Sequence, residues 1–133
     1  MSSVFADAAF YVAAFSFHDA FHATARRFSE TYSGGIVTSE FVLLEVGNFF
    51  SRPKDRALYC QFIADIRTDE QTTIIGCGRE WFERGFSLFE ARLDKEWSLV
   101  DCISMEIMSR CKLRQVLTTD HHFEQAGFEV LLK

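Results

Sequence analysis

The sequence lacks the short patterns that mark several common enzyme classes. It contains no C-x-x-C pair, no glycine-rich phosphate-binding loop and no G-x-S-x-G nucleophile elbow. These absences argue against a zinc framework, a dinucleotide-binding or P-loop fold, and a serine hydrolase with an elbow nucleophile. It also lacks repeats, linkers and low-complexity tracts, so we expect residues 1–133 to form a single domain.

Long apolar runs are missing as well. No segment approaches the roughly 20 apolar residues that a membrane-spanning helix requires. The first residues, Met1 to Val4, show no basic region before an apolar core. We therefore expect no signal peptide, no membrane association and a cytoplasmic location.

Cysteines are few, and their spacing suggests no framework. Cys60, Cys77, Cys102 and Cys111 mostly lie in apolar contexts. We expect small buried thiols in a reducing compartment, since a disulfide or zinc framework usually shows a tighter spacing.

Basic residues are outnumbered, with 14 Lys and Arg against 19 Asp and Glu, for a net charge of −5. An evenly spread negative charge disfavours nucleic-acid binding. If four acids bind metal, the other 15 nearly balance the 14 bases. The acidic excess would then belong to one site that divalent cations neutralise.

What the sequence does contain is apolar patterning, with 48% hydrophobic residues and 15 Phe. Period-two and helical spacings predict short strands at 4–7, 36–37, 72–75, 116–119 and 130–132, and helices at 8–15, 18–32, 40–50, 54–67, 80–93 and 98–111. Alternating strands and helices predict an α/β fold with a mostly parallel sheet and helices on both faces. In the helix at 80–93 we expect core positions at Trp81, Phe82, Phe86 and Phe89, and we expect the helix at 98–111 to be buried.

Two acids end predicted strands. Asp7 follows the first strand and Asp120 follows the strand at 116–119. In parallel sheets, ligands bind beyond the carboxyl ends of the strands, where the strand order reverses. Asp7 also suits a helix N-cap, and the sequence leaves both roles open.

Two further acids lie on predicted helices. Glu45 falls within an apolar stripe, where a carboxylate is costly unless it is paired, protonated or metal-bound, although a position at the edge of the stripe would also explain it. Asn48, one turn later, could hydrogen-bond Glu45. Asp101 completes a capping box with Ser98, so capping and a site role are both open.

We expect Asp7, Glu45, Asp101 and Asp120 to face one cleft. Four carboxylates without a neighbouring Lys or Arg repel one another, and a hard cation would remove that repulsion. Oxygen-only ligands suit Mg²⁺ or Mn²⁺. Metal-assisted phosphodiester hydrolysis is the reaction class that uses these groups best. His18 and His22, four apart, could share a zinc, but we see no third ligand and expect them to be exposed.

The pattern S-L-x-D-C…L-T-T-D-x-H-F-x-Q-A-G-F, which spans residues 98–128, resembles the C-terminal signature of the PIN-domain nucleases, especially the VapC-like toxins of bacterial toxin–antitoxin pairs. The resemblance extends in family order to the earlier acids. Asp7, Glu45, Asp101 and Asp120 are similar to the four family acids. Ala8 departs from the family, where many members carry Thr or Ser, and this could weaken support of Asp7.

The resemblance implies an α/β/α sandwich with four or five short strands, cleavage of RNA with Mg²⁺ or Mn²⁺, a homodimer and a cognate antitoxin partner. It suggests Asp94 and Thr119 as residues that support the acids. His121 and His122 could touch substrate or be ordinary loop residues. Candidate phosphate contacts, each also explicable as a solvated charge, are Arg52, Lys54, Arg56, Arg92 and Lys95.

Two other functions compete with a nuclease. A catalytically silent domain of the same fold could bind protein or RNA, which the negative net charge would favour. A phosphoacceptor receiver domain is also α/β with an acidic pocket. It requires paired acids after the first strand and a lysine after the last, whereas Asp7 has no acidic neighbour and Lys133 merely ends the chain.

Overall fold

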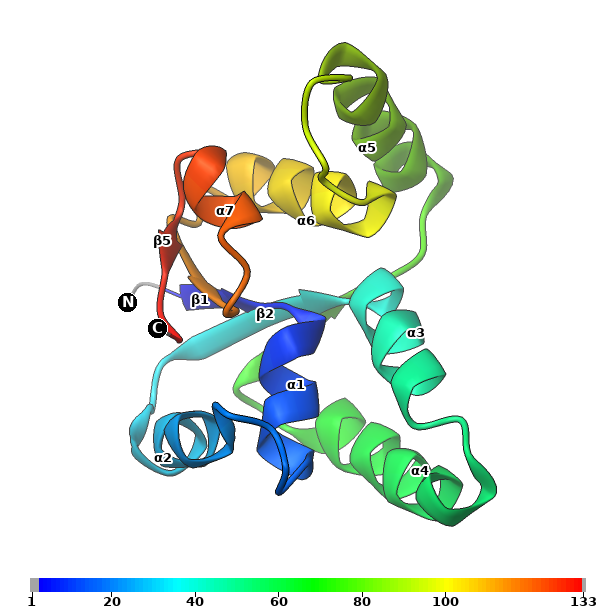
Figure 1. The fold of residues 1–133 in the computed structure, drawn as a ribbon, viewed down its shortest axis with the longest axis vertical. Coiled ribbons are helices and arrows are strands. Elements are labelled where there is room, and N and C mark those ends of the chain that lie inside the picture. Colours follow the sequence, from blue (N-terminus) through cyan, green and yellow to red (C-terminus); the bar gives the residue numbers. More distant parts are fainter. Residues whose placement is uncertain (1–2, 133) are drawn as a thin grey trace.

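The computed structural model describes residues 3–132, which form a five-stranded sheet flanked by helices (Figure 1). The strands are β1 (Ser3–Ala6), β2 (Gly35–Ser39), β3 (Thr72–Ile75), β4 (Gln115–Leu117) and β5 (Glu129–Val130). The helices are α1 (Ala8–Phe15), α2 (His22–Thr31), α3 (Glu40–Phe49), α4 (Pro53–Thr68), α5 (Arg79–Ala91), α6 (Leu99–Arg110) and α7 (His122–Gln125).

The sheet is parallel throughout, with the strand order β3-β2-β1-β4-β5. The chain adds β2 and β3 on one side of β1, then crosses to add β4 and β5 on the other. The order therefore reverses between β1 and β4, which are the strands that precede Asp7 and Asp120. This confirms the predicted α/β class and its mostly parallel sheet.

Helices cover both faces of the sheet, as the alternating pattern predicted. Figure 1 shows α1, α2 and α4 on one face, α6 and α7 on the other, and α5 packed outside α6. The strands β1 and β4 and the helix α6 supply much of the buried core, including Phe5, Ile107 and Leu117, all with 0% exposure. The expectation that α6 is buried is confirmed.

Short-range signals fix several helix ends. Ser39 caps α3 by accepting a hydrogen bond from the Val42 N–H, and Pro53 opens α4, where a missing N–H costs nothing.

Gly85 allows α5 to approach α6 closely, because a Cβ there would lie 2.9 Å from the backbone nitrogen of Ile103. Gly85 thus lets α5 pack directly against α6, the helix that carries Asp101.

Several element boundaries differ from expectation. The helix predicted from His18 begins at His22, because residues 16–21 form turns. The strand predicted to run to Thr119 ends at Leu117, and α7 was not predicted at all, since four residues are too few for a helical period.

Burial was also misjudged at some positions. Phe82, Phe86 and Phe89 of α5 are between 41% and 44% exposed, not in the core as expected. The helix meets α6 through its glycine side, which leaves this aromatic side outside. All four cysteines are free, but only Cys102 is buried, so the expectation of buried thiols is wrong for the other three. Within residues 3–132, no helix is long and apolar enough to cross a membrane.

Candidate active site

The reversal of strand order brings Asp7 and Asp120 to the same edge of the sheet. The Asp7 N–H donates to the carbonyl of Leu117 at 3.1 Å, which extends the β1–β4 pairing by one step. Thr118 and Thr119 then lead to Asp120. This is the edge at which parallel sheets bind ligands.

Asp7 is the most deeply buried of the four acids, with 5% exposure. Its Oδ2 accepts a hydrogen bond from the Thr118 hydroxyl at 2.9 Å, while its Oδ1 is buried and has no partner. Burial, then the charge of Asp101, raises the pKa of Asp7 to about 7, against smaller opposing effects of the Thr118 hydroxyl and the Ala8 N–H. Asp7 occupies the N-cap position of α1, yet its side chain makes no capping hydrogen bond. A buried oxygen without a partner is a position where a cation would fit.

Asp101 fills the capping role that the sequence left open, and its side chain also contacts His122. Its Oδ2 accepts the Ser98 N–H at 3.1 Å, and its own N–H donates to the Ser98 hydroxyl at 3.0 Å, which completes a capping box. The same Oδ2 lies 3.2 Å from Nδ1 of His122. Burial raises the pKa of Asp101, and the charge of Asp120 adds to the effect, although the Ser98 N–H and His122 oppose it.

Glu45 lies at the solvent edge of α3, not inside its apolar stripe. Its neighbours Leu43 and Val46 are buried, whereas Glu45 is exposed. Partial burial raises the pKa of Glu45, and the charges of Asp101 and Asp120 add to this. No hydrogen bond joins Glu45 to Asn48, which is itself exposed, so the structure does not form that expected contact.

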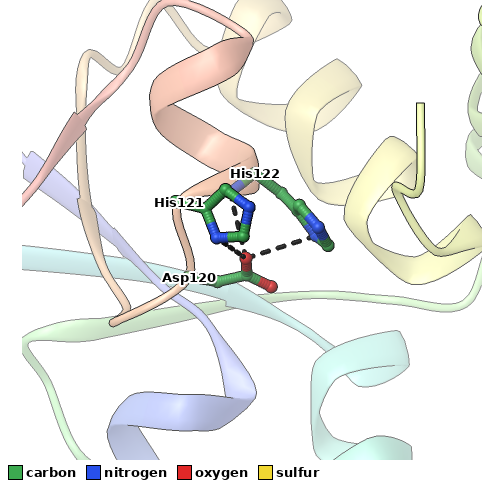
Figure 2. Close-up of side chains that lie close together, drawn as sticks. All are labelled: Asp120, His121 and His122. Carbon is green, nitrogen blue, oxygen red and sulfur yellow. Dashed lines mark hydrogen bonds and ion pairs between the residues drawn. The ribbon is translucent and has the colours of Figure 1, made fainter. Parts of the chain in front are cut away.

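Asp120 sits in a turn that leads into α7, beside two imidazoles (Figure 2). Its Oδ1 accepts the His122 N–H at 2.9 Å, and its own N–H donates to the Thr118 hydroxyl at 3.2 Å. Nδ1 of His122 lies 3.2 Å from Asp120 Oδ1 and an equal distance from Asp101 Oδ2. His122 therefore bridges two of the four carboxylates.

The four acids act on one another electrostatically. Asp7 is affected by Asp101 and Glu45, Glu45 by Asp101 and Asp120, and Asp101 by Asp120. They come from the ends of β1 and β4, from α3 and from α6, so the fold gathers them from across the chain. No lysine or arginine is among the groups that shift the pKa of these acids.

The four carboxylates do not approach one another closely enough for three of them to contact one bare ion. No three of the four carboxylates bring oxygens within 4.8 Å of one another, whereas oxygens on opposite sides of a Mg²⁺ ion are about 4.2 Å apart. Magnesium usually keeps several of its waters and takes only one or two protein carboxylates directly. These residues would therefore fit only a hydrated divalent ion, held partly through water.

Other expected site residues lie apart from the acids. Thr119 is half-buried and forms no hydrogen bond with the acids; Thr118, which the sequence reasoning passed over, makes the contacts expected of it. Asp94 is exposed and pairs with Arg92 through two hydrogen bonds of 3.0 and 3.1 Å. Thr118 and Thr119 are consecutive threonines after a strand, so the sequence alone does not show which of their side chains contacts the acids.

The candidate phosphate contacts fall in two groups on the surface. The first, at the start of α4, comprises Arg52, Lys54 and Arg56. The second lies between α5 and α6, where Arg92 and Lys95 are placed over the ring of Trp97, at 5.1 and 5.8 Å from its centroid.

The pair of histidines near the N-terminus forms no metal site. Nδ1 of His22 lies 2.8 Å from the Ala13 carbonyl, its ring packs against Phe17, and His18 is exposed in the preceding turn. Among residues 3–132, the cluster with metal-ligand spacing is Asp120, His121 and His122.

Comparison with known proteins defines the fold. The chain matches no protein-family model and no curated protein sequence. Its structure has a PIN-like α/β fold, which confirms the architecture that the sequence resemblance implied. It is similar to the crystal structure of VapC20 from Mycobacterium tuberculosis, a sarcin–ricin loop cleaving toxin. The TM-score is 0.88, with 24% identity over 98% of this chain and 99% of that one.

Proposed function

We propose that this protein is a metal-dependent endoribonuclease that hydrolyses RNA phosphodiester bonds. The observation that carries the proposal is the mutual repulsion of Asp7, Glu45, Asp101 and Asp120 at the edge where the strand order reverses. The raised pKa values of Asp7, Glu45 and Asp101, together with the unpartnered buried oxygen of Asp7, favour a cation.

The four carboxylates would hold Mg²⁺ or Mn²⁺, which supplies charge neutralisation and water activation when bound. Thr118 orients Asp7 by donating to one oxygen, and the other, which has no hydrogen-bond partner, would be available to the ion. The capping box holds Asp101 at the start of α6. Asp7 and Asp101 are therefore each positioned by a neighbouring group of the chain, as catalysis by orientation requires.

The substrate proposal rests on the structural similarity to VapC20, which cleaves the sarcin–ricin loop. We propose an RNA substrate, approached by the basic groups at the start of α4 and around Trp97. By the same similarity we propose that the protein is the toxin of a toxin–antitoxin pair, acts in the cytoplasm as a homodimer and is silenced by an antitoxin protein.

The direct test is RNA cleavage by purified protein. Total RNA and a sarcin–ricin loop oligonucleotide are incubated with Mn²⁺ or Mg²⁺ and analysed on gels. We expect cleavage by the wild type, loss of cleavage in excess EDTA, and loss in Asp7→Asn and Asp101→Asn. Glu83→Gln, an exposed acid on α5, is the matched control and should cleave normally.

A silent domain would behave differently. It would leave RNA intact with either ion and bind no divalent cation through the four acids. Cleavage that persists in EDTA, or at wild-type rate in Asp7→Asn, would instead point to a contaminating nuclease and contradict the proposal.

A further inference from the structure

Three consecutive residues at the rim of the acidic site form a second cluster. Asp120, His121 and His122 each offer one ligand atom, and these atoms lie within 4.8 Å of one another (Figure 2). Nδ1 of His122 is 3.2 Å from Asp120 Oδ1, and Nδ1 of His121 is 3.8 Å from the same oxygen. The cluster contains two nitrogens, unlike the carboxylate-only set beside it.

The local backbone holds these groups in place. The His122 N–H fixes the carboxylate of Asp120, and the Thr118 hydroxyl accepts the Asp120 N–H. The side chains of His122 and Asp120 are 19% and 32% exposed, and that of His121 is 71% exposed. The cluster therefore opens to solvent on the His121 side, where water could complete a coordination sphere.

Ligand type and spacing select the ion. Zinc binds imidazole nitrogen and carboxylate oxygen at about 2.0–2.2 Å, which separates the ligands of a tetrahedral ion by about 3.3–3.5 Å. The observed separations of 3.2 and 3.8 Å lie close to that value. Imidazole suits transition ions, whereas Mg²⁺ favours oxygen, and Zn²⁺ exceeds Mn²⁺ in affinity for such sites.

We propose that Asp120, His121 and His122 form a zinc site at the rim of the acidic site. Water would fill the remaining position, because the chain supplies three ligands here and zinc takes four. The site is distinct from the four-carboxylate set but shares Asp120 with it.

Because Asp120 belongs to both sets of ligands, zinc binding would affect the four carboxylates. This step rests on the proposed function. Zinc would occupy Asp120, and Nδ1 of His122 would have to release Asp101, which it contacts at 3.2 Å. Both changes remove support from the carboxylates proposed to hold Mg²⁺ or Mn²⁺. Zinc is therefore expected to weaken Mn²⁺ binding and inhibit RNA cleavage.

The test is calorimetric titration of Zn²⁺ into tag-free protein. Cys60, Cys77 and Cys111 are exposed thiols that would bind zinc, so all variants carry serine at these three positions. We expect His121→Ala and His122→Ala each to weaken Zn²⁺ binding by more than about tenfold, because even outer-shell changes cost about 10–100-fold. His18→Ala, an exposed histidine outside the cluster, should bind Zn²⁺ normally.

A second readout locates the ligand atoms. Nuclear magnetic resonance of the ¹⁵N-labelled imidazoles should show zinc-dependent shifts of Nδ1 in His121 and His122 but not in His18. His121 is largely exposed, so its variant cannot fail merely by unfolding. Absence of zinc binding in the background protein, or binding unchanged in both cluster variants, would overturn the proposal.

Failure of the zinc site and failure of the nuclease proposal are distinguishable. If Mn²⁺ does not bind but Zn²⁺ binds through His121 and His122, the nuclease proposal fails and the zinc site stands. If Mn²⁺ binds through the acids while Zn²⁺ binding does not depend on His121 and His122, only the zinc site fails.

Discussion

The hydroxyl of Thr118 donates a hydrogen bond of 2.9 Å to the carboxylate of Asp7, although 111 positions separate the two residues. The same hydroxyl accepts the N–H of Asp120. One buried side chain therefore ties together the acids that follow β1 and β4. The candidate site depends on this link between the two ends of the chain.

Removing that hydroxyl should weaken metal binding. Thr118→Val keeps the shape but leaves Asp7 without its donor and the Asp120 N–H without its acceptor. Groups that orient metal ligands typically contribute 10–100-fold in affinity, so we expect Mn²⁺ binding to weaken by about that factor. Thr118→Ser, which retains the hydroxyl, should restore most of the affinity. Calorimetry in which the valine variant binds Mn²⁺ like the wild type would refute this role for Thr118.

The raised pKa of Asp7 predicts how stability changes with pH in metal-free protein. An unfolded Asp titrates near 3.8, whereas Asp7 in the folded protein titrates at about 7. Between these values only the unfolded state has lost its proton, so the contribution of Asp7 to stability falls as pH rises. This difference in pKa corresponds to a loss of at most about 4 kcal/mol in the free energy of unfolding, and the loss is complete above pH 7.

Asp7→Asn cannot ionise and should escape this penalty. In EDTA, we expect urea unfolding to give similar stabilities for variant and wild type at pH 4, and a more stable variant at pH 8. Glu83→Gln should show no such pH-dependent difference. If Asp7→Asn is no more stable than the wild type at pH 8, the buried charge of ionised Asp7 does not destabilise the folded protein.

The close crossing of α5 and α6 predicts a stability effect away from the acids. In Gly85→Ala the new Cβ would lie 2.9 Å from the backbone nitrogen and Cα of Ile103, and backbone atoms cannot move aside easily. Overpacking of this kind costs about 1–3 kcal/mol. Ser87→Ala, at an exposed position of the same helix, should change the free energy of unfolding little. Equal denaturation midpoints for both variants would show that the helices adjust freely.

Much of the fold could be predicted because local signals agree with the global pattern. The strand at Thr72–Ile75 was located to the residue, and the capping box at Ser98 fixed the start of α6. The burial of the aromatic residues on α5 was harder to predict, because the helical spacing of Phe82 and Phe86 is the same whether they face the core or solvent. The choice depends on Gly85, which brings a different side of α5 against α6.

The positions of the candidate acids relative to the strands were predicted in outline but not in detail. Asp7 directly follows β1, Asp120 follows β4 after two threonines, and approximate strand ends can be recognised from the sequence. The role of Thr118, in place of Thr119, depends on β4 ending at Leu117, which the apolar pattern did not reveal. The bridging position of His122 depends on α7, which is too short for periodicity to predict.

The central claim is that four distant carboxylates share one cation site, and Mn²⁺ calorimetry tests it most directly. The wild type is compared with Asp7→Asn, Glu45→Gln, Asp101→Asn and Asp120→Asn, with Glu83→Gln as the exposed control. The account predicts that each site variant binds Mn²⁺ at least about tenfold more weakly while the control binds normally. Wild-type affinity in all four site variants, or no Mn²⁺ binding by the wild type, would contradict it.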